Sequence, residues 1–501
     1  MAVPSPPLVL ADVLAAHAAA RADAVALSFE GGQLRYGELC RRCERLAAQL
    51  WHGWGVRPGD RVAWLGANHP GQLVLLFALA RIGAILLPLN FRLSPGEWDA
   101  LMVDCAPAHL VHDDAWAAAA QELAARHGLA VHPAEALTDE GDWPSPPCGA
   151  ESRSPVLLVY TSGTTSRAKA AVHTQANLLA NMAIAAQVQK MTAQDVVATM
   201  LPLFHVGGLC IQTLPALYVG ARVILHARFA AEAALDCFER DRPTLTLQVP
   251  ATMKALIEQP RWDSADLASL RAVWAGSSLL PAGLVQAFHA RGLTVCNVYG
   301  ATETGPFSIA LAPEQARSHP GSCGWPAPGV EVRLGDEQAG VGELLIRGPN
   351  VISRYWPDLP ACDPQGWFHT GDLATRARDG AYTVVGRAKD LIISGGENIH
   401  PAEIESLLAE HPAVAECAAF GLPDDEWGEV VAAAVVLKPG QAVSEQELRS
   451  YLTGRLARYK LPRHWLWLAG LPKTALGKVQ RQALAQLIRS DAADGQASPT
   501  G

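Results

Sequence analysis

The chain carries little charge, and the charge it carries is not basic. Only 18% of its 501 residues are charged, the formal net charge is -9, and no local cluster of lysine and arginine stands out. A protein that holds a phosphate backbone needs a positive surface field. The composition therefore argues against nucleic-acid binding. Half of the residues are hydrophobic, and the length favours two or more domains.

Paired cysteines of the metal-binding kind are also scarce. The ten cysteines are scattered singly, apart from Cys40 and Cys43, and no second C-x-x-C or nearby histidine pair completes a metal-ligand set. This usage fits a reducing cytoplasm, where we expect the protein to be located.

An export signal and a membrane span are the next absences. The N-terminus has no basic segment, and Asp12 and His17 interrupt its apolar stretch. Residues 71–90 are the most apolar run, but Arg81 and Pro88 break it, which predicts a buried helix followed by a strand. We expect no transmembrane segment, while transient contact with a membrane surface stays open.

The two common nucleotide-binding motifs are missing, but a different phosphate-binding loop is present. Neither G-x-x-x-x-G-K-[ST] nor a strand-linked G-x-G-x-x-G occurs, whereas residues 160–170 read YTSGTTSRAKA after an apolar run. Gly163 permits close backbone approach and Lys169 supplies positive charge to a polyphosphate. An ordinary Ser/Thr-rich surface loop would share this composition. The hydroxyl donors are Thr161, Ser162, Thr164 and Thr165.

A second motif, YGATETG at residues 299–305, follows another apolar run. Thr302 and Glu303 would lie at the carboxyl end of a strand, where open α/β sheets bind ligands. A carboxylate beside phosphates is suited to Mg²⁺, which keeps much of its water and needs only one or two protein oxygens. The alternative is a turn with a helix-capping threonine.

A third region combines HTGDL at 369–373 with GRAKDLIISGGENIHPAEIE at 386–405. Asp372 could accept hydrogen bonds from both ribose hydroxyls, and Arg387 could donate to the same sugar or to phosphate. A structural salt bridge between the two is the alternative. Gly395 and Gly396 could bring backbone close to a ligand or form only a turn.

The coarse organisation is α/β in the first 300 residues. Apolar β-rich runs alternate there with Ala/Leu-rich helical stretches, and from about 320 to 386 short Gly- and Pro-rich strands predict an antiparallel region. The segment after it predicts a small α+β domain, with helices over 401–410 and 444–457. Lys478 lies in a turn before the last helix, a place where a lone lysine is usually only solvated.

Taken in order, these segments resemble the acyl-adenylate-forming superfamily, which includes acyl-CoA synthetases, adenylation domains of peptide synthetases and beetle luciferases. The match also includes PLFH at 202–205, AGSSLLP at 275–281 and Lys478, and it spans nearly the whole chain. The resemblance implies an α/β protein whose large N-terminal domain has two layered α/β subdomains and a β-rich subdomain, followed by a small mobile α+β domain. The implied boundaries are 1–386 for the large domain, 387–390 for a hinge at Lys389, 391–490 for the small domain and 491–501 for a disordered tail.

The resemblance also implies an AMP-forming ligase that uses ATP, Mg²⁺ and coenzyme A. Lys478 would bridge the acid oxygen and the α-phosphate during formation of acyl-AMP, and a rotation of the small domain would then allow the thioester to form. Glu303 would serve catalysis and the metal, with Thr161 as a second metal contact. Further implied nucleotide contacts are Gly276, Ser277, Ser278, Tyr299, Gly300, Thr302, Asp372 and Arg387, and the implied CoA contacts are Gly395, Gly396 and Trp427.

One part of the phosphate loop departs from the family pattern TSGTTGxPKG. Ser166, Ala168 and Ala170 stand at its glycine and proline places. If Ser166 must adopt a positive φ, the cost is about 1–2 kcal/mol, which could slow ATP capture or pyrophosphate release.

The acid is expected to be a monocarboxylate without an α-amino group. His205 stands where amino-acid-activating domains usually have an aspartate region, so it could gate or orient the carboxylate, or be a core histidine beside Phe204. The predicted acyl pocket contains no cation, and fatty and aromatic acids both remain open. It consists of Val206, Gly207, Gly208, Ala275, Ala301 and Gly305.

Coenzyme A is the expected acceptor, because no carrier-protein-like segment follows the small domain. An enzyme that loads a separate carrier protein, and a non-catalytic protein that binds ATP or acyl-AMP, are the alternatives. A homodimer is expected only because homodimers are the most frequent oligomers.

Overall fold

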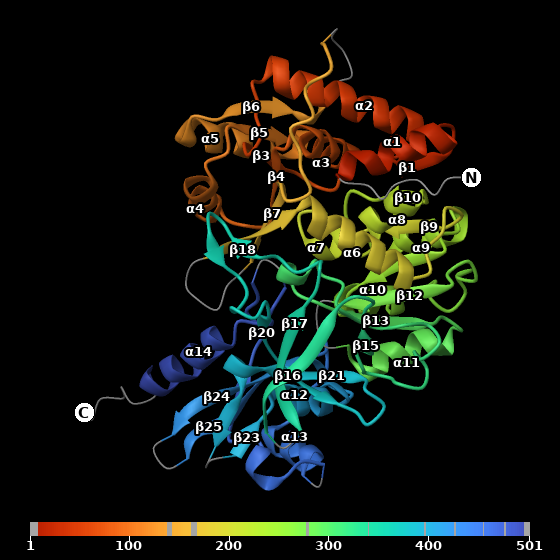
Figure 1. Ribbon diagram of the computed structural model, residues 1–501. Coiled ribbons are helices and arrows are strands. Elements are labelled where there is room, and N and C mark those ends of the chain that lie inside the picture. Colours follow the sequence, from red (N-terminus) through yellow and green to blue (C-terminus); the bar gives the residue numbers. More distant parts are fainter. Residues whose placement is uncertain are drawn as a thin grey trace. The chain divides into compact units, whose positions relative to one another are not determined.

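The computed structural model describes residues 9–137, 143–161, 168–276, 280–338, 340–394, 397–424, 427–453, 455–474 and 477–494, and Figure 1 colours them along the chain. The chain forms two compact units. The first contains Met1–Arg333, Leu345–His369 and Arg378–Tyr382, and the second contains Leu334–Leu344, Thr370–Ala377 and Thr383–Gly501. The second unit thus takes two segments from the predicted β-rich region, so the division is not a single cut at residue 386.

A nine-stranded sheet forms one half of the first unit. Its order is β15-β14-β13-β12-β11-β9-β10-β1-β2, and the run from β13 to β1 is parallel throughout. The carboxyl ends of these parallel strands therefore meet at one edge. The strands are β1 (Val25–Phe29), β2 (Gly32–Arg35), β9 (Val196–Thr199), β10 (Arg222–Leu225), β11 (Leu245–Gln248), β12 (Ala272–Gly276), β13 (Val295–Tyr299), β14 (Ile309–Leu311) and β15 (Trp325–Pro326).

An eight-stranded sheet forms the other half, in the order β19-β18-β8-β7-β4-β3-β5-β6. Its strands β7 and β8 are an antiparallel pair, and β18 adds to β8 in the same sense. The strands are β3 (Arg61–Leu65), β4 (Ile85–Leu89), β5 (His109–His112), β6 (Ala130–Pro133), β7 (Pro155–Thr161), β8 (Lys169–Thr174), β18 (Arg354–Tyr355) and β19 (Leu359–Pro360).

Helices pack between and outside these sheets. The largest core contains side chains of both sheets and of α1, α2, α3, α6 and α8, so these helices lie between the sheets. Separate cores join α9, α10 and α11 to the nine-stranded sheet, and α4 and α5 to the other. The helices are α1 (Leu10–Arg21), α2 (Tyr36–Ala48), α3 (Pro70–Ile82), α4 (Pro95–Cys105), α5 (Ala117–His127), α6 (Gln175–Val188), α7 (Val206–Gly208), α8 (Leu214–Val219), α9 (Ala231–Arg240), α10 (Pro250–Ile257) and α11 (Ala282–Ala290).

The apolar run at 71–90 folds as the sequence predicts, into α3 and then β4. His69 caps the helix by accepting a hydrogen bond from the Gly71 N–H, Pro70 takes the first turn, and Gly83 ends it with φ 75°. The helix is buried over nearly its whole surface, which explains its composition. Among the described residues, no helix combines the length and apolarity needed to cross a membrane.

Short helical segments complete the chain. They are η1 (Gln49–Gly53), η2 (Asp114–Trp116), η3 (Ala134–Ala136), η4 (Leu209–Thr213), η5 (Thr302–Thr304), η6 (Ala388–Asp390) and η7 (Arg458–Lys460).

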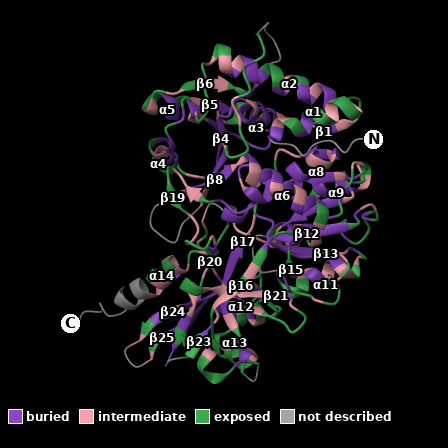
Figure 2. Ribbon diagram, viewed as in Figure 1, coloured by how far each residue is buried: buried purple, intermediate pink, exposed green. Residues whose placement is uncertain are grey.

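The chain passes between the units within a four-stranded sheet, ordered β16-β17-β20-β21. The second unit then has a sheet ordered β23-β22-β25-β24, with β26 beside β25. Figure 2 shows buried residues along its central strands. The elements are β16 (Glu331–Gln338), β17 (Val341–Arg347), β20 (Phe368–Arg376), β21 (Tyr382–Arg387), β22 (Ile392–Ser394), β23 (Glu397–Ile399), α12 (Pro401–Ala409), β24 (Val414–Asp424), β25 (Gly428–Leu437), α13 (Glu445–Leu452), β26 (His464–Trp467) and α14 (Arg481–Asp494).

Two predicted boundaries need correction. The helix predicted over 444–457 is α13, which ends at Leu452 because Thr453 is extended, with φ -65° and ψ 130°. Helix α14 continues to Asp494, into the predicted disordered tail, where Ala492 and Ala493 favour helix. The remainder of that tail lies outside the described residues.

Candidate functional site

The carboxyl edge of the nine-stranded sheet brings two predicted nucleotide contacts together. Gly276 ends β12 and Tyr299 ends the adjacent parallel strand β13, in which Val298 is the register partner of Gly276. A Cβ on Gly276 would come within 2.9 Å of the Val298 carbonyl oxygen, so the strands require glycine there. Ser277 and Ser278 lie outside the described residues.

The turn after β13 folds back tightly on itself. A Cβ on Gly300 would lie 1.7 Å from the Pro306 oxygen, and Gly305 has φ 91°. The Ala301 N–H donates to Thr304 Oγ1 at 3.0 Å, which closes η5 around Thr302 and Glu303. These glycines therefore let the turn hold Glu303 at the sheet edge.

Glu303 is buried, with 9% of its surface exposed, and is held from two sides. The Tyr355 hydroxyl donates to Glu303 Oε1 at 2.9 Å, and the Ile352 N–H donates to the Glu303 carbonyl at 2.9 Å. Burial, and then the nearby carboxylate, raise the pKa of Tyr355 far above its usual range, so its hydroxyl stays a donor.

The same carboxylate suits a magnesium ion. None of the described residues donates a hydrogen bond to its other oxygen, Oε2. The described residues contain no cluster of three or more His, Cys, Asp or Glu side chains fit to hold a metal by themselves. Mg²⁺ needs only one or two protein carboxylates when it is shared with phosphates and water, so Glu303 fits this group.

Lys169 lies near the ring of Tyr355, the residue whose hydroxyl binds Glu303. Tyr355 pairs with Ala171 across β18 and β8, and side chains two residues apart on a strand share a face. The Lys169 Nζ accordingly lies 5.4 Å from the centroid of the Tyr355 ring.

Thr161 and Lys169 flank the predicted phosphate loop. They are register partners at the loop end of the β7–β8 hairpin, and Thr161 Oγ1 donates to the Lys169 carbonyl at 3.4 Å. Ala170 is fully buried in β8. The loop residues between them, Ser162, Gly163, Thr164, Thr165 and Ser166, lie outside the described residues.

His205 follows β9 at the same sheet edge. Its Nδ1 accepts a hydrogen bond from the Gly207 N–H at 3.0 Å, which caps α7 and leaves Nε2 to carry the proton of the neutral ring. The half-buried ring stands beside Phe204, which packs edge-on against Phe91 with centroids 5.2 Å apart.

The other predicted acyl-pocket residues differ in how deeply, and in which element, they are buried. Val206, Gly207 and Gly208 are buried in α7, and Ala301 is half-buried at the start of η5. Ala275 is fully buried in the core that includes α9, α10 and α11.

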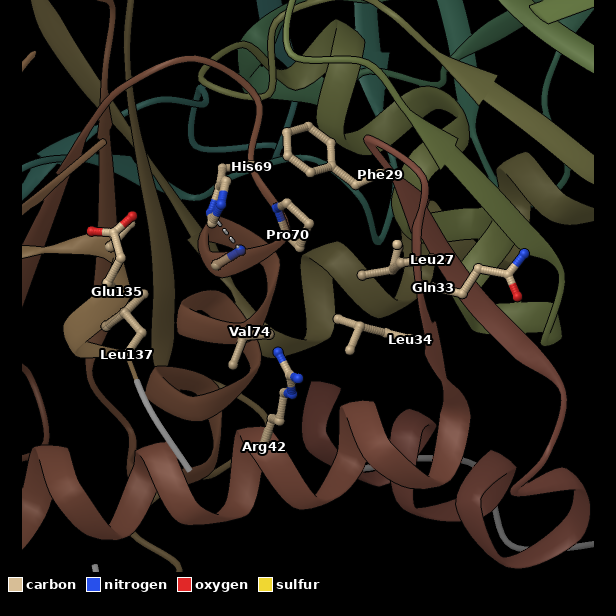
Figure 3. A pocket seen from close by; sticks show the side chains of 13 residues that line it. Leu27, Phe29, Gln33, Leu34, Arg42, His69, Pro70, Val74, Glu135 and Leu137 are labelled. Carbon is tan, nitrogen blue, oxygen red and sulfur yellow. Dashed lines mark hydrogen bonds between the residues drawn. The ribbon is translucent and has the colours of Figure 1, made fainter. Parts of the chain in front are cut away.

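A large cavity lies elsewhere in the first unit. It has a volume of about 500 Å³ and lies among the β1–β2 hairpin, α2, the start of α3 and η3. Figure 3 shows that the polar side chains of Arg42 and His69 line it together with the apolar side chains of Leu34 and Val74. None of its lining residues belongs to the predicted nucleotide or acyl site.

In the second unit, Asp372 and Arg387 form a pair. The Arg387 Nε lies 2.9 Å from Asp372 Oδ1, and the aspartate is 8% exposed. Their strands β20 and β21 thus bring both predicted ribose contacts together. The salt bridge is compatible with either of the two sequence interpretations.

Lys478 lies on an exposed turn of the second unit. The Lys478 N–H donates to Thr474 Oγ1 at 3.2 Å, and the Thr474 N–H donates to the Lys478 carbonyl at 2.7 Å. Three residues later, Arg481 binds Asp390 and Glu405 at 3.2 and 2.8 Å. Lys389, the predicted hinge, is exposed in η6 beside Asp390.

The predicted CoA contacts are only partly described. Trp427 is half-buried, its backbone N–H donates to Asp424 Oδ1 at 2.9 Å, and the Arg463 guanidinium lies 4.9 Å from its ring. Ser394 pairs with Gly428, so β22 ends beside Trp427. Gly395 and Gly396 lie outside the described residues.

Tyr355 and Arg481 are the contacts that the sequence reasoning missed. Tyr355 belongs to the segment RYW after a glycine- and proline-rich stretch, and Arg481 belongs to the Lys478 motif. An aromatic residue inside a very short polar strand is the signal that could have drawn attention to Tyr355.

Comparison with known proteins identifies the family of this chain. The AMP-binding enzyme family model matches residues 14–356, and the model of the AMP-binding enzyme C-terminal domain matches 403–478. Indoleacetate–CoA ligase of Aromatoleum aromaticum is 42% identical over 94% of this chain and 96% of its own length. Feruloyl-CoA synthase of an Amycolatopsis species is 40% identical over 91% and 94%.

A solved structure extends the likeness to the fold. O-succinylbenzoate–CoA synthetase from Bacillus subtilis, in complex with the acyl-adenylate OSB-AMP, has a TM-score of 0.86 at 31% identity, over 94% of this chain and 97% of the other. A further structure of that enzyme holds ATP and a magnesium ion. The predicted α/β fold is confirmed, and so is the predicted enzyme class, an AMP-forming acid–thiol ligase. This chain therefore belongs to the AMP-binding enzyme family.

Proposed function

We propose that this ATP-dependent carboxylate–CoA ligase acts on an aromatic monocarboxylic acid. Two relatives that are at least 40% identical, and that match more than nine-tenths of their own length, are named for aromatic acids: indoleacetate and ferulate. The observation that carries the adenylation chemistry is the buried Glu303 carboxylate, which Tyr355 holds beside Lys169 at a sheet edge.

The first reaction joins the acid to AMP. An oxygen of the acid carboxylate attacks the α-phosphorus of ATP, and the bond from that phosphorus to pyrophosphate breaks. Lys169 and the hydroxyl loop from Thr161 to Thr165 would hold the phosphates, and Gly276 and Tyr299 would flank the adenine. Magnesium ion, when bound at Glu303, would offset the charge of the phosphates.

The acid and the ribose need their own contacts. We propose that His205 orients the carboxylate through its Nε2–H, because its Nδ1 is committed to the Gly207 N–H. Asp372 and Arg387 would contact the ribose. Lys478 would bridge the carboxylate and the α-phosphate, offset the repulsion between these two anions, and stabilise the negative charge that shifts towards pyrophosphate.

The second reaction transfers the acyl group. The CoA sulfur attacks the acyl carbonyl carbon, the bond to AMP breaks, and the thiol proton is released to solvent or a base. We propose that the small domain rotates at Lys389 between the two steps, which removes Lys478 and presents Trp427 and the segment at 394–396 to CoA.

A panel assay tests this proposal. The protein is incubated with ATP, Mg²⁺ and aromatic or fatty acids, with and without CoA, and AMP, acyl-AMP and thioester are measured. We expect AMP and a thioester with aromatic acids only when CoA is present. AMP release that requires a carrier protein in place of CoA would contradict the acceptor. ATP binding without pyrophosphate release for any acid would indicate a non-catalytic protein.

A cytoplasmic location and a homodimer also remain proposals. The ten cysteines, all among the described residues, form no disulfide, which is the usual state in a reducing compartment. Homodimers are simply the most frequent oligomers.

A further inference from the structure

A buried glutamine near His205 carries an unpaired oxygen. Gln212 lies in η4, the segment that continues from α7, and only 2% of its surface is exposed. Its Oε1 has no hydrogen-bond partner among the described residues. Leaving a buried acceptor unpaired costs about 1–3 kcal/mol, so an interior site with this feature calls for a donor.

The neighbouring amide fixes which end of Gln212 is unpaired. Gln189, which is fully buried, donates from Nε2 to the Ile211 carbonyl at 2.7 Å, so its Oε1 is turned toward Gln212. Gln212 must then present Nε2 to that oxygen, at 3.0 Å. Exchanging the two ends of the Gln212 amide would place two oxygens together, so Oε1 is the atom that remains.

The nearby hydroxyl hydrogens are already used. Thr213 Oγ1 donates to the Gly208 carbonyl at 2.7 Å, so the 2.9 Å contact between Thr199 and Thr213 takes the hydrogen of Thr199. Neither threonine has a hydrogen left for Gln212.

Gln212 lines a small cavity beside the predicted acyl pocket. The cavity has a volume of about 10 Å³, and its lining includes Gly208 and Thr199. The rest of the lining is apolar. This is room for about one water-sized polar group, such as a hydroxyl or an N–H, and not for a ring.

The position along the chain matches the length of an aromatic acid. Gln212 lies seven residues after His205, which caps α7, and belongs to the π-helix η4 that continues from α7; at the 1.5 Å per residue of an α-helix this spacing corresponds to roughly 10 Å. An acid whose carboxylate is at His205 would bring its far end close to Gln212.

From these observations we propose that Gln212 Oε1 accepts a hydrogen bond from an O–H or N–H at the end of the aromatic acid distal to its carboxylate. This inference rests on the proposed function, because it needs an aromatic acid bound at His205. It narrows the substrate class to aromatic acids with a distal donor. It also makes Gln212 a specificity-determining residue.

Matched pairs of acids test the inference. 4-Hydroxycinnamate is compared with cinnamate, and indole-3-acetate with 1-naphthylacetate, by kcat/KM for CoA-dependent AMP formation. We expect wild-type protein to prefer the donor-bearing member of at least one pair by about 10-fold or more. Gln212→Leu and Gln212→Met should reduce that preference to about twofold or less, and should do so by slowing the donor-bearing acid.

Gln72→Leu is the matched control, because Gln72 is a buried glutamine of α3 with an unpaired amide nitrogen and lies outside the proposed site. The Gln72→Leu variant should prefer donor-bearing acids to the same extent as the wild-type protein. A wild-type ratio near one for both pairs would overturn the inference, as would a wild-type preference kept by both Gln212 variants. If wild type activates no aromatic acid at all, the proposed function fails instead. If Gln212→Leu does not fold, the inference is still tested by the Gln212→Met variant and by the wild-type ratio of kcat/KM within each pair of acids.

Discussion

The carboxyl edge of the nine-stranded sheet and the turn of Lys478 present their charged groups in opposite ways. Glu303 is buried, and a tyrosine hydroxyl and a backbone N–H hold it in place. Lys478 is exposed on a turn that two hydrogen bonds to Thr474 close. Glu303 is thus fixed by its surroundings, while Lys478 lies on the surface of the second unit, and the proposed mechanism uses Lys478 in the first reaction only.

The largest expected effect comes from removing the lysine. Lys478→Ala should lower acyl-AMP formation by about 10²-fold or more, because an electrostatic donor to the transition state is lost. ATP binding should change little, since the lysine acts on charge that develops during the reaction. Pyrophosphate release and equilibrium ATP binding are the two measurements.

A neighbouring lysine provides the control for this comparison. Lys473 lies on the same turn, and its Nζ is paired with Glu416 at 2.8 and 2.9 Å. Lys473→Ala should leave adenylation within about twofold of wild type, because exposed ion pairs contribute little. Equal losses in both variants would mean that the turn, and not Lys478, matters.

The next effect concerns Glu303 and the tyrosine that holds it. Tyr355→Phe keeps the ring beside Lys169 and removes the hydroxyl that orients Glu303. We expect the Mg²⁺ concentration for half-maximal adenylation to rise by about 10-fold or more, in line with other groups that orient metal ligands. The measurement is the adenylation rate against Mg²⁺ at fixed ATP.

Tyr36→Phe is the matched control for that variant. Tyr36 is fully buried, and its hydroxyl donates to the Ala221 carbonyl at 2.7 Å, in α2 of the same unit. Its loss should cost about 1 kcal/mol of stability and leave the Mg²⁺ response unchanged. A Tyr355→Phe protein that is less stable but has a normal Mg²⁺ response would assign the tyrosine a purely structural role.

The smallest expected effect comes from the support of the lysine turn. Arg481 binds Asp390, Glu405 and the Ala419 carbonyl, and its side chain is 26% exposed. Arg481→Ala should destabilise the second unit by about 1–3 kcal/mol and reduce adenylation several-fold, because the base of the turn loosens. Thermal unfolding and the adenylation rate measure the two parts.

Arg455→Ala separates this effect from general loss of charge. Arg455 pairs with Glu410 in the same unit, but its side chain is 46% exposed. We expect a change within about 0.5 kcal/mol and unaltered adenylation. A similar loss in both arginine variants would remove Arg481 from the account.

The sequence predicts the α/β fold well, because the fold depends on local patterns. Strands ending in Gly276 and Tyr299 follow from apolar runs bounded by glycine, and parallel pairing then brings their ends together. Tyr355 could not be predicted, since its link to Glu303 depends on the pairing of β18 with β8, far away in the sequence. Gln212 had a weak signal as the lone amide in an apolar run, but only packing shows that its oxygen is unpaired.

The most direct test of the contrast between the two regions bypasses the first reaction. Lys478→Ala protein is given synthetic acyl-AMP of an aromatic acid together with CoA, and thioester formation is followed in a single turnover. We predict a rate within a few-fold of wild type, although acyl-AMP formation by the same variant is about 10²-fold slower. If both steps slow to the same extent, the lysine is not specific to activation and the account is contradicted.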